Sequence, residues 1–253
     1  MLSFQIINVL SKVLKNNIEE FSNIKTKEGE LNVDTYLKKK IIKTINSENV
    51  FINENLNGII FNRIYDNKEY FDLKNKDESI SKITDLVISY TIDGEKLFSE
   101  IEVKKTNKDK IPGSSINQIN PNKCIIFFKM GKETKVEIGY YSQAVSGRVA
   151  FPDRAPRPEV SFKVLEESNK EIDETNFSEK LIECQKEKSF LYEGQLSKYL
   201  SEQWLNNLFA FKFTTWFHKA ISIFSLSLIE KYESMNDNEK ESFKNEIRKN
   251  NNK

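Results

Sequence analysis

The chain has few residues of the types that define several common protein classes. Its 253 residues include two cysteines, one histidine, eight glycines and five prolines. Cys124 and Cys184 are too few for a disulfide framework or a cysteine-based zinc site, so we expect a reducing, cytoplasmic location. With His218 as the only histidine, a histidine-based metal site or a Ser–His–Asp triad has no support.

The sequence also has little net charge and no long apolar run. Lys and Arg number 39 and Asp and Glu number 38, so the net charge is +1, and contacts with nucleic acid must come from local basic patches. No run approaches the roughly 20 apolar residues of a membrane span, so we expect no membrane partner. The P-loop patterns GxxxxGKS and GxxxxGKT are absent from the sequence, so we expect no nucleotide cofactor.

The most informative stretch of the chain is residues 83–105, ITDLVISYTIDGEKLFSEIEVKK. Apolar and polar residues alternate on either side of Asp93-Gly94, as in two antiparallel strands. Asp-Gly is typical of a two-residue type I′ turn, which fixes the register of the strands that it joins. In that register Asp85 faces Glu102.

Facing residues lie on the same side of a sheet, and Lys104, two residues beyond Glu102, shares that side. Like charges that face each other destabilise a sheet, so two facing carboxylates are kept most readily with a cation between them. Mg²⁺ prefers oxygen ligands, retains water and phosphate, and lowers the pKa of bound water. We therefore expect Asp85 and Glu102 to bind metal, and Lys104 to assist the attacking water or neutralise charge on a phosphate.

Asp85 followed by Glu102-Val103-Lys104 resembles the motif of the PD-(D/E)xK nuclease superfamily, with Thr84 where the family name has Pro. The resemblance covers about residues 30–145. It implies an α/β (α+β) fold, in which a small mixed β-sheet with an αβββαβ core is flanked by helices and followed by a helical C-terminal region.

The resemblance also implies a function. It points to a type II restriction-like endodeoxyribonuclease, a homodimer that hydrolyses phosphodiester bonds of double-stranded DNA with Mg²⁺, or with Mn²⁺ as a substitute. The carbonyl of Val103 would be a third metal ligand beside Asp85 and Glu102.

Other interpretations remain open. A structure-selective repair nuclease or a junction-resolving nuclease would use the same core, and a DNA-binding protein could keep the fold without catalysis. A structural or interaction protein that uses the aromatic helices is a further alternative. Asp85, Glu102 and Lys104 could also form an ordinary solvated face, because ExK triplets recur in this Lys- and Glu-rich chain, as at Glu133-Thr134-Lys135.

Four further residues are candidates for the same site. Superfamily members often place another acid on a preceding helix, where Asp34 or Glu54 could serve, although an acid near a helix start is equally explained by the helix dipole. Gln118 resembles the Gln that many members carry on the helix after ExK. Glu100 lies on the same face as Glu102 and would replace it if the strand carried a bulge.

Two segments are candidate DNA contacts. Ser114 or Ser115 can cap a helix whose free N–H groups bind phosphate. Residues 142–158 contain three prolines and three of the five arginines of the chain, and arginine reads guanine bidentately. This segment is either a DNA-reading loop or a rigid surface loop with Arg–carboxylate pairs. The candidate DNA contacts are Lys110, Ser114, Ser115, Arg148, Arg154 and Arg157.

The rest of the chain follows ordinary patterns. Apolar spacing predicts helices over residues 2–22 and 31–46, and the lysines at 38–40 read as a solvated face that could also meet a phosphate backbone. Residues 123–130 and 135–141 read as strands. Residues 176–232 predict helices with an aromatic-rich face, either a helix–helix core or a dimer interface. We expect one domain over residues 1–235 and a polar tail over 236–253 that frays.

Overall fold

The computed structural model describes residues 2–22, 24, 33–47, 58–74, 84–113, 120–150, 157–187 and 216–251. The chain divides into two compact units, Met1–Glu202 and Gln203–Lys253. This division differs from the single domain expected over residues 1–235. The candidate site lies wholly in the first unit.

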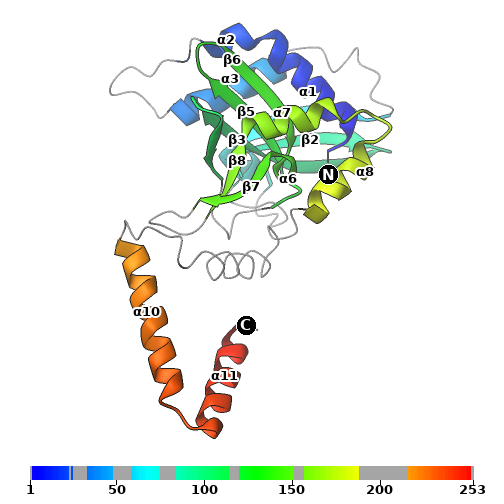
Figure 1. Ribbon diagram of the computed structural model, residues 1–253. Coiled ribbons are helices and arrows are strands. Elements are labelled where there is room, and N and C mark those ends of the chain that lie inside the picture. Colours follow the sequence, from blue (N-terminus) through cyan, green and yellow to red (C-terminus); the bar gives the residue numbers. More distant parts are fainter. Residues whose placement is uncertain are drawn as a thin grey trace. The chain divides into compact units, whose positions relative to one another are not determined.

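A mixed five-stranded sheet forms the centre of the first unit (Figure 1). The strands lie in the order β1-β2-β3-β5-β6, and every neighbouring pair is antiparallel except β3 and β5, which are parallel. The predicted α/β class is therefore confirmed. The strands are β1 (Ile60–Asp66), β2 (Leu86–Ile92), β3 (Glu95–Thr106), β5 (Cys124–Met130) and β6 (Thr134–Tyr140).

The hairpin of β2 and β3 has the register expected from its turn. Ile92 pairs with Glu95, and the pairing continues without a shift to Leu86 and Ile101. Asp93 and Gly94 have φ angles of 50° and 82°, as the two central residues of a type I′ turn require. The side-chain alternation of the whole hairpin therefore follows from one dipeptide.

Four helices and one face of the sheet form the main core. They are α1 (Phe4–Asn16), α2 (Ile18–Ser22), α3 (Val33–Ser47) and α8 (Phe177–Glu187). In α3 the buried residues Leu37, Ile41 and Ile45 recur every fourth position, which forms one apolar stripe against the sheet. Each such side chain contributes about 1.5–3 kcal/mol on burial, so the stripe fixes how α3 is rotated.

Smaller elements cover the other face. Ile125 and Phe127 of β5 pack with Phe162 and Leu165 of α7 (Phe162–Lys170), on the side opposite α1 (Figure 1). The short α6 (Tyr141–Ala144) and a three-stranded sheet join this cluster. That sheet contains β4 (Lys110–Pro112), β8 (Arg157–Ser161) and β7 (Val145–Ala150) in this order.

Residues 142–158, expected to form a loop, are mostly regular structure. The segment contains most of α6, all of β7 and the start of β8, and Val149 pairs with Pro158. Proline can occupy a strand where its missing N–H is not needed, so a Pro-rich composition did not exclude a strand here. Residues 151–156 lie outside the described part of the chain.

The element order matches the expected core as far as the structure describes it. Helix α3 is followed by β1, β2, β3 and β5, with α5 (Asn67–Lys74) inserted after β1. Tyr70 of α5 packs on Val87 of β2. The helix expected after β3 would include residues 114–119, which lie outside the described part.

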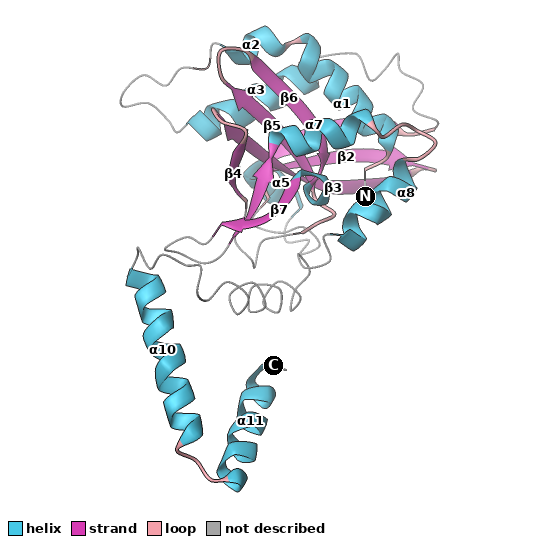
Figure 2. Cartoon of the chain, in the orientation of Figure 1, coloured by secondary structure: helices cyan, strands magenta, loops and turns pink. Residues whose placement is uncertain are grey.

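In the second unit the structure describes residues 216–251, which form two helices, α10 (Trp216–Glu233) and α11 (Asp237–Asn251) (Figure 2). The polar tail expected over residues 236–253 is therefore helical from Asp237 to Asn251. The N-terminus of α11 is closed by reciprocal hydrogen bonds: the Glu239 N–H donates to Asn236 Oδ1 at 3.1 Å, and the Asn236 N–H donates to Glu239 Oε2 at 2.9 Å. This capping box stabilises a helix that has only two apolar residues, Phe243 and Ile247, to signal it.

Within the described helices, none is both long and apolar enough to cross a lipid bilayer.

Candidate active site

The candidate site lies where β2 begins and β3 continues beyond it. β2 has 7 residues and β3 has 12, and their pairing starts at Leu86 and Ile101. Residues 102–106 of β3 therefore extend past β2, and among the described residues no strand pairs with that side of them. We call the unpaired side of residues 102–106 the inner edge. The other side of the same residues pairs with β5.

Asp85 lies at the inner edge. Its Oδ2 accepts a hydrogen bond from the Val103 N–H at 2.8 Å, and its Oδ1 accepts one from Lys38 Nζ at 2.5 Å. The preceding residue, Thr84, is buried and donates its hydroxyl hydrogen bond to the carbonyl of Ile101 (3.1 Å) or of Leu86 (3.3 Å). Thr84 thus ties the chain to β3 and directs Asp85 towards the Glu102-Val103-Lys104 triplet.

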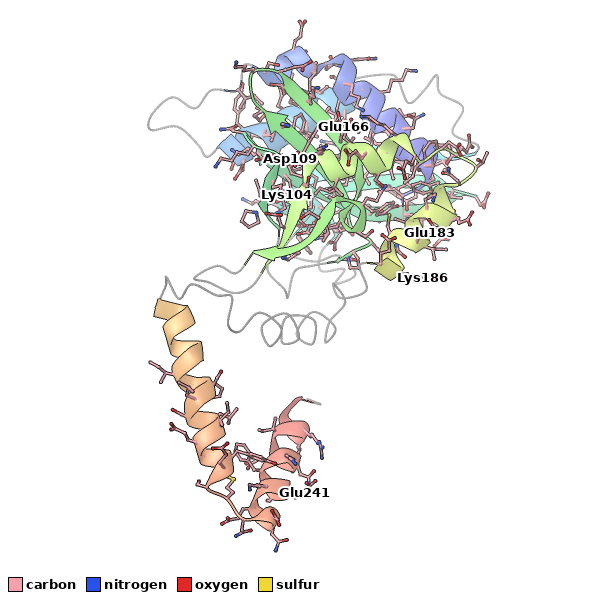
Figure 3. All side chains as sticks on the ribbon, in the orientation of Figure 1. Lys104, Asp109, Glu166, Glu183, Lys186 and Glu241 are labelled. Carbon is pink, nitrogen blue, oxygen red and sulfur yellow. The ribbon has the colours of Figure 1, made fainter. Side chains whose placement is uncertain are left out.

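Glu102 and Lys104 lie on the same face of β3. Lys104 Nζ is 2.5 Å from Glu102 Oε1, and the two side chains are 18% and 9% exposed. Figure 3 labels Lys104 on the sheet of the first unit. Two charges in so little solvent are screened weakly, so the attraction between Lys104 and Glu102 is stronger than that of an exposed ion pair.

The side chain of Glu100 has different neighbours from that of Glu102. Glu100 pairs with Val87, as the regular register requires, and its Oε2 lies 2.9 Å from Nζ of Lys123, the residue before β5. The hairpin has no bulge between its turn and Leu86, so the register places Glu102 next to Val103 at the inner edge. Glu100 is two residues further into the sheet, beside Val87.

Two hollows meet at Asp85 and Lys38. The first, the cleft, has a volume of about 300 Å³, and the second has a volume of about 330 Å³. Both are lined by lysines, which suits a polyanionic ligand. The cleft is lined by Asp34, Leu37, Lys38, Asp85, Val103, Lys104, Lys105 and Ile111. The second hollow is lined by Thr35, Lys38, Lys39, Ile42, Asp66, Asn67, Lys68, Thr84 and Asp85.

The donor set of the site suits a hard divalent cation. Asp85 and Glu102 offer carboxylate oxygens, and the Val103 carbonyl points to the same side of β3 as its N–H, towards Asp85. In the described part of the chain, no three His, Cys, Asp or Glu side chains gather as a metal-binding group. The protein would therefore supply two carboxylates and a carbonyl, and water and phosphate would supply the rest, which is how Mg²⁺ is usually held.

The other predicted site residues have mixed positions. Asp34 lines the cleft, where its Oδ1 lies 2.9 Å from Lys105 Nζ. Lys110 lies on β4 and forms an ion pair with Glu159 at 3.0 Å, so part of its charge is neutralised within the small sheet. The backbones of Arg148 and Arg157 lie on β7 and β8. Outside the described residues are Glu54, Ser114, Ser115, Gln118 and Arg154.

Two lysines of the cleft, Lys38 and Lys105, were not identified as site residues from the sequence. Lys105 directly follows the triplet, and Lys38 directly follows Leu37, a residue of the buried stripe of α3. A residue next to a buried stripe lies where the helix borders the sheet. This position could have predicted that Lys38 lies near the site. The run of three lysines at 38–40 obscured this signal, because it reads as one exposed face.

No protein-family model matches this chain, and no match to it was found among curated proteins. Any functional assignment therefore depends on the chemistry of the site itself.

Proposed function

We propose that this chain is a cytoplasmic, Mg²⁺-dependent endodeoxyribonuclease of type II restriction character, which hydrolyses phosphodiester bonds in double-stranded DNA. The observation that supports this proposal best is the position of Asp85, whose carboxylate reaches the main chain of the Glu102-Val103-Lys104 triplet across the inner edge. A cleft of about 300 Å³ with three lysines lies beside it.

Each residue has a role in this proposal. Asp85, Glu102 and the Val103 carbonyl would hold Mg²⁺, which when bound stabilises charge on a phosphate and lowers the pKa of water. The ammonium group of Lys104 would donate hydrogen bonds to the attacking water or to a phosphate oxygen. Lys105 would neutralise a neighbouring phosphate. Leu37 and Ile111 would form the apolar walls of the cleft.

A homodimer would suit the geometry of the substrate. The chain has one Asp85–triplet arrangement, and one such site cuts one DNA strand at a time. A two-fold symmetric dimer would present two sites to the two antiparallel strands. The same symmetry would suit recognition of a palindromic sequence.

Digestion of unmethylated phage DNA by the purified protein tests the proposal, with Mg²⁺ in one reaction and EDTA in the other. We expect discrete fragments with Mg²⁺ and none with EDTA. Asp85→Asn and Lys104→Met should each abolish cutting, whereas Lys96→Met should not, because Lys96 is an exposed lysine near the turn of the same hairpin. Full activity of either site variant would refute the assignment of the site.

Other digestion patterns would favour the related functions. A smear would indicate a nuclease without sequence choice, and cutting of branched DNA alone would indicate a junction-resolving or repair enzyme. Discrete ends shared by all fragments would give the recognition sequence directly.

A second candidate function is DNA binding without catalysis. One observation favours it: both carboxylates are already paired, Asp85 with Lys38 and Glu102 with Lys104. In that case the wild-type protein would bind DNA but cut none of the substrates with either Mg²⁺ or Mn²⁺.

A further inference from the structure

Lys38 has a position that the sequence pattern and the proposed roles leave unexplained. It lies on α3, and its Nζ is 2.5 Å from Asp85 Oδ1. The two side chains are 30% and 22% exposed, so the pair is partly withdrawn from solvent. Lys38 and Asp85 line both hollows, which places the pair where the two meet.

The fold holds this lysine in place. Leu37 and Ile41 of the same helix are fully buried against the sheet, so the rotation of α3 about its axis is fixed. Its neighbours in the lysine run differ from it: Lys39 is exposed, and Lys40 pairs with Glu20 at 2.5 Å. Only one lysine of the run therefore meets a residue of the candidate site, and the others provide matched controls on the same helix.

The hydrogen bonds of Asp85 make Lys38 a competitor for a metal ion. Oδ2 accepts a hydrogen bond from the Val103 N–H, and the other oxygen, Oδ1, accepts one from Lys38 Nζ. A divalent cation at Oδ1 would lie within a few ångströms of the ammonium group, and the two positive charges repel each other. Metal binding therefore requires Lys38 to move away from Asp85.

We propose that Lys38 is a positioning residue that competes with the divalent metal ion for Asp85, and so sets the metal concentration at which the site fills. This inference rests on the proposed function, because it assumes a metal site at Asp85. Without metal, Lys38 neutralises Asp85 and keeps its carboxylate at the inner edge. Because Lys38 lines both hollows, its ammonium group can move from the Asp85 carboxylate to a phosphate oxygen and still remain in the site.

Titration of the full-length protein with Mn²⁺, without DNA, tests this inference by a readout that does not depend on cutting. Isothermal calorimetry or Mn²⁺ electron paramagnetic resonance would compare wild type with Lys38→Met. We expect the Kd for Mn²⁺ to fall by about five- to tenfold in Lys38→Met, since a partly buried ion pair that must be broken opposes binding by about that factor. Lys38→Arg keeps the charge and should stay near wild type.

Two control variants separate direct competition from the general loss of a positive charge. Lys105→Met removes a cation from the same cleft without touching Asp85, and Lys40→Met removes one from the same helix. Both should change the Kd for Mn²⁺ by less than twofold, since they act only through screened charge. If Lys38→Met binds Mn²⁺ no more tightly than Lys105→Met, the inference is refuted.

A different result would identify failure of the proposed function itself. If wild type, Lys38→Met and Asp85→Asn all bind Mn²⁺ with the same weak affinity, there is no metal site at Asp85 and both proposals fail. If Asp85→Asn abolishes Mn²⁺ binding but Lys38→Met leaves it unchanged, the metal site stands and only the role of Lys38 is refuted. In an active enzyme, Lys38→Met should also reach half-maximal cutting at a five- to tenfold lower Mg²⁺ concentration, provided that the same pair opposes Mg²⁺.

Discussion

Glu100 and Glu102 lie two residues apart on one face of β3, but their partners give them different roles. Glu100 pairs with Lys123, whose side chain is 4% exposed, whereas Glu102 pairs with Lys104, which lines the cleft. A charge as deeply buried as that of Lys123 is costly without its partner. We therefore expect a structural role for Glu100 and propose a site role for Glu102.

Substitution of each glutamate by glutamine separates these roles. Glu100→Gln should lower the free energy of unfolding by about 3 kcal/mol, because it leaves the Lys123 ammonium buried without a countercharge, and it should retain cutting. Glu102→Gln should abolish cutting. Urea denaturation and DNA digestion measure the two effects, with the exposed Glu95→Gln as a control. A stable but inactive Glu100→Gln would show that the roles are reversed.

Cys124 and Tyr140 pair across β5 and β6 and are both buried. Burial raises the pKa of the Cys124 thiol from its usual value of 9.0 to about 12. Burial, and repulsion from Cys124 and Tyr90, raise the pKa of Tyr140 well above its ordinary range, although its hydrogen bond to the Leu2 carbonyl acts in the opposite direction. Both groups stay neutral in the folded protein at physiological pH.

The raised pKa values predict a loss of stability in alkaline solution. Between pH 9 and 12 the unfolded chain releases the Cys124 proton while the folded chain retains it, so the free energy of unfolding decreases as pH rises. The slope from this thiol approaches about 1.4 kcal/mol per pH unit. Urea denaturation at pH 8, 9 and 10 should show a shallower slope for Cys124→Ala than for wild type. Equal slopes would show that the Cys124 thiol is not the source of the pH dependence.

At the scale of elements, the β2–β3 hairpin depends on the backbone of its turn. Gly94 has a φ angle of 82°, and a β-carbon added there would meet no atom within 4 Å. Gly94→Ala should therefore lower the free energy of unfolding by about 1–2 kcal/mol through backbone strain alone. Asp93→Asn should be nearly neutral, because Asn tolerates positive φ. Thermal denaturation measures both, and a neutral Gly94→Ala would mean that the turn can change its type.

The elements that the sequence predicts correctly are those in which local chemistry and tertiary packing agree. Asp93-Gly94 specifies the hairpin, the apolar run at 123–130 corresponds to β5, and the stripe at Leu37, Ile41 and Ile45 corresponds to α3. For the site, the turn alone brings Asp85 near the Glu102-Val103-Lys104 triplet. These features depend on short-range patterns that a single sequence contains.

The elements that the sequence does not predict correctly depend on other information. Helix α11 has a capping box and charged ends but only two apolar residues, Phe243 and Ile247, so apolar periodicity did not predict it. β7 and β8 are strands because they pair with each other, and β8 also pairs with β4, a long-range contact that composition does not reveal. The pairing of Lys38 with Asp85 joins a residue of α3 to the residue before β2, 47 positions later, so only the fold brings them together.

For the whole molecule, a net charge of +1 conceals an uneven distribution of charge. Five lysines line the two hollows that meet at Asp85: Lys38, Lys39, Lys68, Lys104 and Lys105. Binding of DNA should thus depend on this local group of cations.

The salt dependence of DNA binding tests this distribution. Lys39→Met and Lys68→Met should each reduce the slope of log K against log salt concentration by about 0.9, since each removes one phosphate contact. Both are exposed, so the fold should tolerate the changes. Fluorescence anisotropy in EDTA measures the slope, with Lys132→Met, on the turn between β5 and β6, as the control. An unchanged slope in both variants would place the DNA elsewhere.

A stretch of strand without a neighbour also attracts other chains, because its open N–H and C=O groups form a template on which a foreign strand can add. Along the inner edge of β3, Asp85 covers the Val103 N–H, and Lys104 and Lys105 follow directly. Capped donors and charged side chains of this kind act as gatekeepers against aggregation. The residues proposed to cut DNA would thus also prevent copies of the chain from joining strand to strand while they fold.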